Sequence, residues 1–174
     1  MKEKNLKLKD QIAAPSGKLG ILIPGLGGAV STTFIAGVEL VRRQLAEPIG
    51  SLTQMGSIRL GKRYEHRSPK IKDFVPLASL DDLVFGGWDL YEANGYEAAM
   101  YARVLSREHL EAIKGPLATI RPMKAVFDNR FVRNLDGTHV KQGLNLRRQV
   151  DALKEDILRF RSDLIRMQTI PVGA

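Results

Sequence analysis

The feature that most constrains this chain is a short apolar run followed directly by a glycine-rich turn and a helical pattern. The run covers residues 19–23, and Pro24 and Gly25 end it. Such a short, continuously apolar run is typical of a strand in a parallel sheet that is covered on both faces. After the turn, apolar residues recur at helical spacing and predict a buried helix face made of Phe34, Val38, Val41 and Leu45. The order of strand, glycine turn and helix predicts an α/β fold.

The turn itself has the residues that a dinucleotide-binding turn needs. Gly25 allows a tight turn, and Gly27 and Gly28 let backbone N–H groups come close to a pyrophosphate. The helix expected to open near Ala29 would direct its positive end at that anion. This context favours a Rossmann-like parallel sheet with flanking helices and a dinucleotide cofactor.

The match to the dinucleotide fingerprint is partial. Val30 stands where the ordinary fingerprint has glycine, and the absence of a following Gly-Lys-Ser/Thr excludes a Walker A loop. The hydroxyls of residues 31–33, beginning with Ser31, are expected to cap the helix or to donate to phosphate oxygens. One alternative stays open, in which the glycines only join a strand to a helix.

A dinucleotide site also needs an acceptor for the hydroxyls of the adenosine ribose, usually an acidic residue. Glu47 has about the right spacing from the glycines, but it precedes Pro48 and ends no recognisable strand. Asp89 is the better candidate, because it follows a second apolar run at residues 83–85 that Gly86 is expected to end. The carboxyl ends of parallel strands are where such sheets bind ligands. Asp89 could instead be the N-cap of the next helix.

The rest of the chain predicts mainly helices. Two are expected at residues 96–105 and 107–114, with Gly115 and Pro116 stopping the second. The clearest is the last, at residues 146–164, and its apolar spacing favours a helix that faces the core over a coiled coil. A long crossover helix normally leads to another parallel strand, and none is readable after it. We therefore expect residues 19–174 to be the N-terminal part of a truncated Rossmann-like domain. Residues 1–18 are polar and charged, and we expect them to form a mobile basic arm.

Composition narrows the function classes. The formal net charge of +8 suggests nucleic-acid binding, but the basic clusters at residues 147–148 and 159–166 lie beside Glu155, Asp156 and Asp163 in what is expected to be a solvated helix face. There is no cysteine, and the three histidines lie far apart, so no metal site is expected. No apolar run approaches the roughly 20 residues that cross a bilayer. A cytoplasmic protein without membrane or nucleic-acid partners is expected.

Three segments together resemble myo-inositol-1-phosphate synthases: residues 25–33, residues 50–54 (Gly-Ser-Leu-Thr-Gln) and residues 82–89 (Asp-Leu-Val-Phe-Gly-Gly-Trp-Asp). The resemblance implies an NAD-dependent, homotetrameric isomerase that converts D-glucose 6-phosphate to 1L-myo-inositol 1-phosphate. It implies oxidation, enolisation, aldol cyclisation and reduction, with NAD⁺ reduced and later re-oxidised. The resemblance further implies that this reaction is the first step of inositol biosynthesis and that the protein belongs to phospholipid biosynthesis.

The resemblance also implies site residues. It places Leu26, Gly27, Ala29 and Val30 on the phosphates of the cofactor and Asp89 on its adenosine ribose. Ala125 and Val126 resemble a further pair that lines the cofactor. The catalytic residues of the family lie beyond residue 174, so no catalytic residue is predicted here. Two alternatives stay open: the Rossmann domain of another NAD(P)-dependent oxidoreductase, and a basic nucleic-acid-binding module.

Overall fold

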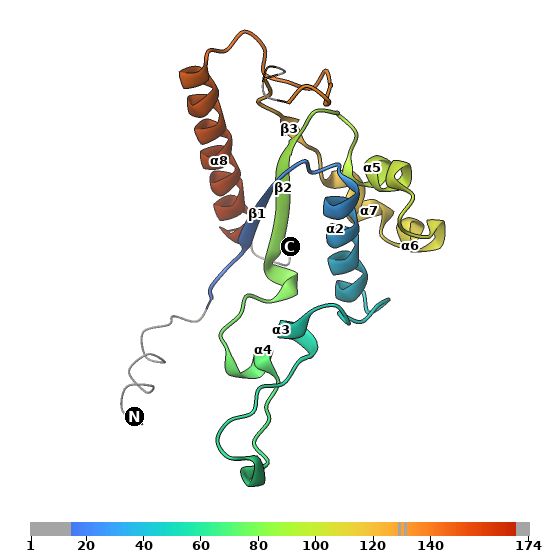
Figure 1. Ribbon diagram of the computed structural model, residues 1–174, viewed down its shortest axis with the longest axis vertical. Coiled ribbons are helices and arrows are strands. Elements are labelled where there is room, and N and C mark those ends of the chain that lie inside the picture. The colour runs from blue at the N-terminus through green and yellow to red at the C-terminus, as the bar shows by residue number, and fades with distance from the viewer. Residues whose placement is uncertain (1–14, 129, 131, 170–174) are drawn as a thin grey trace.

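The computed structural model describes residues 15–128, 130 and 132–169, and its centre is a three-stranded parallel sheet (Figure 1). The strand β1 (Leu19–Pro24) pairs with β2 (Leu83–Asp89), and β2 pairs with the short β3 (Met123–Lys124). Because all three run in the same direction, their carboxyl ends meet at one edge of the sheet. The predicted strand at residues 19–23 is confirmed.

Helices flank the sheet on both faces, as a Rossmann-like fold requires. The long helix α8 (Leu146–Thr169) lies on one side of the sheet (Figure 1). The other side carries α2 (Ala29–Arg42), α5 (Gly95–Ala102), α6 (Arg107–Ala112) and α7 (Lys114–Thr119). The predicted fold class is therefore confirmed.

Between α2 and β2 the chain leaves the sheet and forms an extended projection (Figure 1). An antiparallel bridge between Ser57 and Lys70 holds its two sides together. The short helical elements here are α3 (Leu52–Met55), η1 (Arg63–Glu65), α4 (Ile71–Phe74) and η2 (Leu80–Asp82). The second motif of the resemblance, at residues 50–54, thus lies largely in α3 and away from the carboxyl ends of the strands (Figure 1).

The strand β2 continues beyond Phe85, so the expectation that Gly86 ends it is wrong. The reason is that both glycines of the pair fit inside the strand and make room for its neighbours. A Cβ on Gly86 would lie 2.7 Å from the ring of Phe160 on α8. A Cβ on Gly87 would lie 1.9 Å from the carbonyl oxygen of Ile23 on β1. This double glycine is therefore a packing feature of the sheet.

The helix α2 does not bury the face that its spacing predicted. Phe34 is 47% exposed and Leu45 is 53% exposed, while Val38 is buried as expected. The buried residues of α2 are Thr32, Ile35, Ala36, Val38, Glu39 and Leu40. The prediction was wrong because α2 has apolar residues on more than one face: it packs against α5, α6 and α7, while Phe34 contacts the sheet through the ring of Phe85 on β2.

The pair Gly115–Pro116 does not stop a helix. Instead α6 ends at Ala112, and α7 begins at Lys114 with the proline in its first turn. This is tolerated because the first amides of a helix have no partner inside the helix, so the missing N–H of proline costs nothing there. Leu110, Ile113 and Leu117, which this helix pair supplies, are almost fully buried in the core.

Two expectations fall partly outside the described residues. Most of the predicted basic arm does so, since description begins at Pro15, although β1 begins at Leu19 close to the predicted start of order. The end of the chain after α8, residues 170–174, also lies outside it. Among the described residues no helix is long and apolar enough to cross a membrane.

Candidate functional site

The glycine turn is fixed to the carboxyl end of β2 by backbone hydrogen bonds. The amides of Gly25 and Leu26 both donate to the carbonyl oxygen of Trp88, at 2.8 and 3.1 Å. The amide of Gly27 donates to Oδ2 of Asp89 at 2.8 Å. The turn and the second strand end therefore form one unit, as the sheet topology requires.

Asp89 is buried and uses both carboxylate oxygens at this junction. Besides the bond to Gly27, its Oδ1 accepts from the amide of Tyr91 at 3.0 Å. The alternative that Asp89 is a helix N-cap is wrong, because α5 begins after Asn94, which forms a capping box with Glu97. Asp89 thus shapes a turn directly at the end of β2.

The start of α2 has no side-chain cap. The N-cap residue is Gly28, and the two nearest hydroxyls bond back to carbonyls of the turn: Ser31 Oγ donates to Gly25 at 2.8 Å, and Thr32 Oγ1 to Gly28 at 2.9 Å. The expectation that these hydroxyls cap the helix is therefore wrong. The first-turn amides at residues 29–31, which an α-helix leaves without intrahelical partners, are uncapped by the described side chains and suit an anion.

A cavity of about 670 Å³ lies directly beside this turn, within the size range of cofactor sites. Its walls come from the glycine turn, the end of β2, the end of α5, the segment after β3 and two turns of α8. Aromatic residues line it from three segments: Trp88 and Tyr91 at the end of β2, Tyr101 on α5, and Phe127 after β3. The uncapped helix start supplies donors for phosphates, and the largely apolar walls suit a nucleotide base.

The structure brings together most of the predicted cofactor residues. The cavity is lined by Gly25, Gly27, Gly28, Ala29 and Asp89, and also by Ala125 and Val126. Four other residues that the sequence suggested do not line it, namely Leu26, Val30, Ser31 and Glu47. Leu26 is 2% exposed in the core, and Val30 is 84% exposed on the outer side of α2. Glu47 is exposed beyond the far end of α2.

The turn packs so tightly on itself and on Asp89 that two of its positions favour glycine, which leaves bare backbone beside the start of α2. A Cβ on Gly27 would lie 3.2 Å from Oδ2 of Asp89, and a Cβ on Gly28 would lie 3.1 Å from the carbonyl oxygen of Gly25. Gly25 has a φ of +77°, in the left-handed region that favours glycine. The residues present thus fit a dinucleotide whose phosphates lie against the backbone.

Sequence reasoning missed several residues of this site. The aromatic residues Tyr91, Tyr101 and Phe127 carry no spacing signal, because only the tertiary fold brings their segments together. Asp156 was assigned to a solvated helix face, and that is wrong. Its side chain is 2% exposed, because it lies on the side of α8 that faces Trp88, whose Nε1 donates to Asp156 Oδ2 at 2.8 Å.

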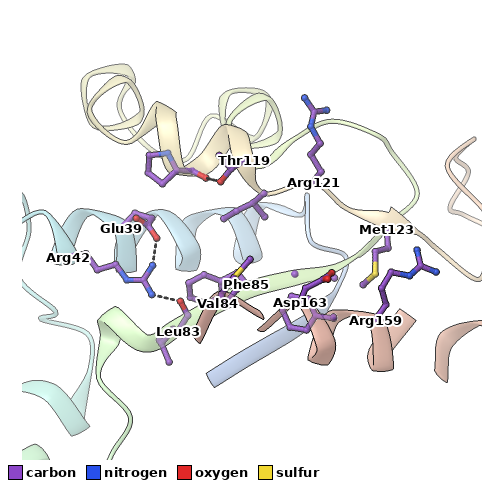
Figure 2. A pocket seen from close by; sticks show the side chains of 16 residues that line it. Glu39, Arg42, Leu83, Val84, Phe85, Thr119, Arg121, Met123, Arg159 and Asp163 are labelled. Carbon is purple, nitrogen blue, oxygen red and sulfur yellow. Dashed lines mark hydrogen bonds and ion pairs between the residues drawn. The ribbon is translucent and has the colours of Figure 1, made fainter. Parts of the chain in front are cut away.

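A second cavity of about 580 Å³ lies along the first half of β2, between α7 and α8 (Figure 2). Arg42 at its edge is engaged in structure: it donates from Nε to the carbonyl of Leu80 at 2.8 Å and pairs with Glu39. Figure 2 also shows its bond to the carbonyl of Leu83. Because open α/β sheets bind ligands at the carboxyl ends of their strands, the first cavity is the candidate site. No cluster suited to a metal ion occurs among the described residues.

Comparison with known proteins decides the family. A family model of an NAD-binding domain, described as myo-inositol-1-phosphate synthase, matches residues 19–170. The chain belongs to the myo-inositol-1-phosphate synthase family. The resemblance seen in the three sequence motifs is thereby confirmed, and NAD as the cofactor of this family domain is confirmed with it.

Individual members of the family agree with this assignment. Inositol-3-phosphate synthase 1 of Bacteroides thetaiotaomicron is 44% identical over 155 residues, which are 89% of this chain and 35% of that protein. Inositol-3-phosphate synthase isozyme 1 of Arabidopsis thaliana is 33% identical, over 92% of this chain and 34% of that protein. A crystal structure of inositol-3-phosphate synthase from Caenorhabditis elegans superposes with a TM-score of 0.73 at 25% identity, covering 86% of this chain and 32% of that one.

The chain thus spans about a third of the length of the inositol-3-phosphate synthases it matches. What it shares with them is the NAD-binding part. Neither alternative, another NAD(P)-dependent oxidoreductase or a basic nucleic-acid-binding module, is favoured by these similarities.

Proposed function

We propose that this chain is the cofactor-binding part of an NAD-dependent inositol-3-phosphate synthase that converts D-glucose 6-phosphate to 1L-myo-inositol 1-phosphate. The observation that carries the proposal is the junction between Gly27 and Asp89, which joins two motifs of the family at the edge of one cavity. Bound NAD supplies the acceptor and later the donor of the hydride in this chemistry. The residues of this chain bind and orient it.

The hydrogen bonds of the turn determine which backbone amides are available to bind the phosphates of the cofactor. The amides of Leu26 and Gly27 already donate to β2, so the phosphates are assigned to the uncapped amides of Ala29, Val30 and Ser31. The exposed side chain of Val30 does not matter for a contact made by its backbone. Gly25, Gly27 and Gly28 supply the close approach to the pyrophosphate.

Asp89 is assigned to the adenosine ribose. Each carboxylate oxygen has two lone pairs, so Asp89 can accept from ribose hydroxyls while it holds the amides of Gly27 and Tyr91. Ala125 and Val126 line the same cavity and are assigned to the wall beside the cofactor. No catalytic residue is assigned in this chain. We propose that the sugar phosphate binds to the part of the enzyme that corresponds to the other two thirds of the relatives. We also propose the tetrameric state and the cytoplasmic location that the family resemblance implies.

The reaction is tested in an enzyme of the relatives' length that contains this chain. We expect glucose 6-phosphate to be consumed and inositol phosphate to be released when NAD⁺ is present, with no net formation of NADH. The matched variant is Asp89→Ala, which should raise the NAD⁺ concentration required for half-maximal release of inositol phosphate. Net formation of NADH in step with sugar consumption would instead assign the chain to an ordinary oxidoreductase. Tight RNA binding without NAD⁺ affinity would favour the nucleic-acid alternative.

A further inference from the structure

A buried carboxylate lies behind the wall of the cofactor cavity and joins three segments that are distant in sequence. Asp156 on α8 accepts from Trp88 Nε1 at the end of β2 at 2.8 Å. It also pairs with Lys141 in the segment after β3, with Nζ to Oδ2 at 2.9 Å and to Oδ1 at 3.1 Å. Its side chain is 2% exposed, while that of Lys141 is 21% exposed.

The cost of burying this charge indicates that its position matters. A buried carboxylate is costly unless it is paired and hydrogen-bonded, and replacing such a pair by apolar residues is often neutral for stability. Stability alone therefore does not explain an acid here. The second cation nearby, Arg159, is 68% exposed and 3.7 Å away, so Lys141 is the main ionic partner.

Of the two partners of Asp156, only Trp88 lines the cavity. Trp88 lines it, next to Asp89, whereas neither Asp156 nor Lys141 does. Leu153 and Ile157, which flank Asp156 on the same helix, line the cavity too. The hydrogen bond from the indole to Asp156 therefore sets both the orientation of Trp88 and the distance of this part of α8 from the end of β2.

We infer that Asp156 is a positioning residue of the cofactor site, acting through the indole of Trp88 to hold the cavity wall in the shape that binds the dinucleotide. This inference rests on the proposed NAD site. It assigns the ion pair with Lys141 to stability of the fold, and the hydrogen bond with Trp88 to cofactor affinity.

Two substitutions at one position separate these effects. Asp156→Asn removes the charge but keeps a side-chain oxygen that can accept from the indole N–H, whereas Asp156→Ala removes both. Both variants should unfold at lower urea concentration than the wild type. For affinity they should differ: we expect the Kd for NADH to rise at least about tenfold in D156A, which is about 1.4 kcal/mol, and to stay within about threefold in D156N.

The only tryptophan of this sequence, Trp88, supplies a spectroscopic readout. Its emission should shift in D156A and remain close to that of the wild type in D156N. Glu39→Gln is the matched control, because Glu39 is also a buried acid with a basic partner, Arg42, yet lies beside the other cavity. E39Q should lower stability and leave both NADH affinity and Trp88 emission unchanged.

The outcomes distinguish this inference from the proposed function. If the wild-type chain does not bind NADH, the proposed site itself is wrong. If it binds NADH and D156A binds equally well, or D156N and E39Q lose as much affinity as D156A, the positioning role is overturned. Should D156A not fold, Trp88→Phe is measured by NADH fluorescence, since it removes the indole donor and keeps the Asp156–Lys141 pair; unchanged affinity would then overturn the inference.

Discussion

The backbone amide of Gly27 donates a hydrogen bond of 2.8 Å to the carboxylate of Asp89, across a separation of 62 residues. This bond joins the glycine turn after β1 to the end of β2 and lies at the edge of the candidate cofactor cavity. Because Asp89 also holds the amide of Tyr91, one side chain organises two turns of the site. Its loss should therefore affect both folding and cofactor binding.

Asp89→Ala should weaken NADH binding at least about tenfold, since it removes an acceptor for the ribose and releases the glycine turn. Hydrogen bonds to charged groups contribute about 1.5 to 3 kcal/mol each, so the free energy of unfolding should fall by about 3 kcal/mol. Calorimetric titration and urea unfolding measure the two effects. Glu92→Ala, at an exposed acid nearby, is the control and should change neither. An unaltered Kd in D89A would remove Asp89 from the site.

Gly87→Ala should strongly destabilise the protein, because the added Cβ would lie 1.9 Å from the carbonyl oxygen of Ile23. Overpacking typically costs 1 to 3 kcal/mol, and a clash with backbone places this variant at about 3 kcal/mol or more. The matched substitution is Gly37→Ala in α2, where a Cβ meets no atom within 4 Å. It should stabilise by about 0.5 to 1 kcal/mol, because glycine is unfavourable inside a helix. Urea midpoints that rank the two variants in the opposite order would contradict the packing of β1 on β2.

The hydroxyl of Tyr96 donates to Glu111 at 2.6 Å, and this bond lowers the pKa of Glu111 and raises the pKa of Tyr96. A lowered folded-state pKa of an acid gives stability that is present above its ordinary pKa and is lost as the pH falls through the folded value. For Tyr96 the raised pKa gives stability that is lost as the pH rises through it. Tyr96→Phe should bring the pKa of Glu111 back up, as measured by NMR titration of its carboxyl group. Identical titration curves in the two proteins would show that this hydrogen bond is absent in solution.

The sequence predicted the parts of the fold whose signal is local. The first strand, the turn at Gly25 and the long last helix each have a continuous pattern, and the structure contains all three. The helix α8 begins at the predicted Leu146 but ends at Thr169, beyond residue 164, and Leu146 and Val150 on its predicted core face are more than half exposed. The position of Asp89 at the carboxyl end of β2 was also predictable from the local sequence. A residue that directly follows an apolar strand of a parallel sheet lies at the edge where the strands end.

The parts that failed depend on partners distant in sequence. The glycine pair in β2 predicts the end of a strand. Its role inside the strand follows only from the packing of Phe160 and Ile23 against it. The face that α2 buries depends on its packing against α5, α6 and α7. The spacing of apolar residues within α2 does not predict these partners. Asp156 looks like any charged helix residue, and only the fold brings it to Trp88.

The most direct test of the cofactor site is energy transfer from Trp88 to bound NADH. Trp88 is the only tryptophan of the sequence and lines the cavity assigned to the dinucleotide. Titration of the 174-residue protein with NADH should quench the emission of Trp88 in a saturable way, with matching sensitised emission from NADH, and Asp89→Ala should shift the curve to higher concentration. Saturable binding of NADH without any transfer from Trp88, or no binding at all, would contradict the assignment of the cofactor to this cavity.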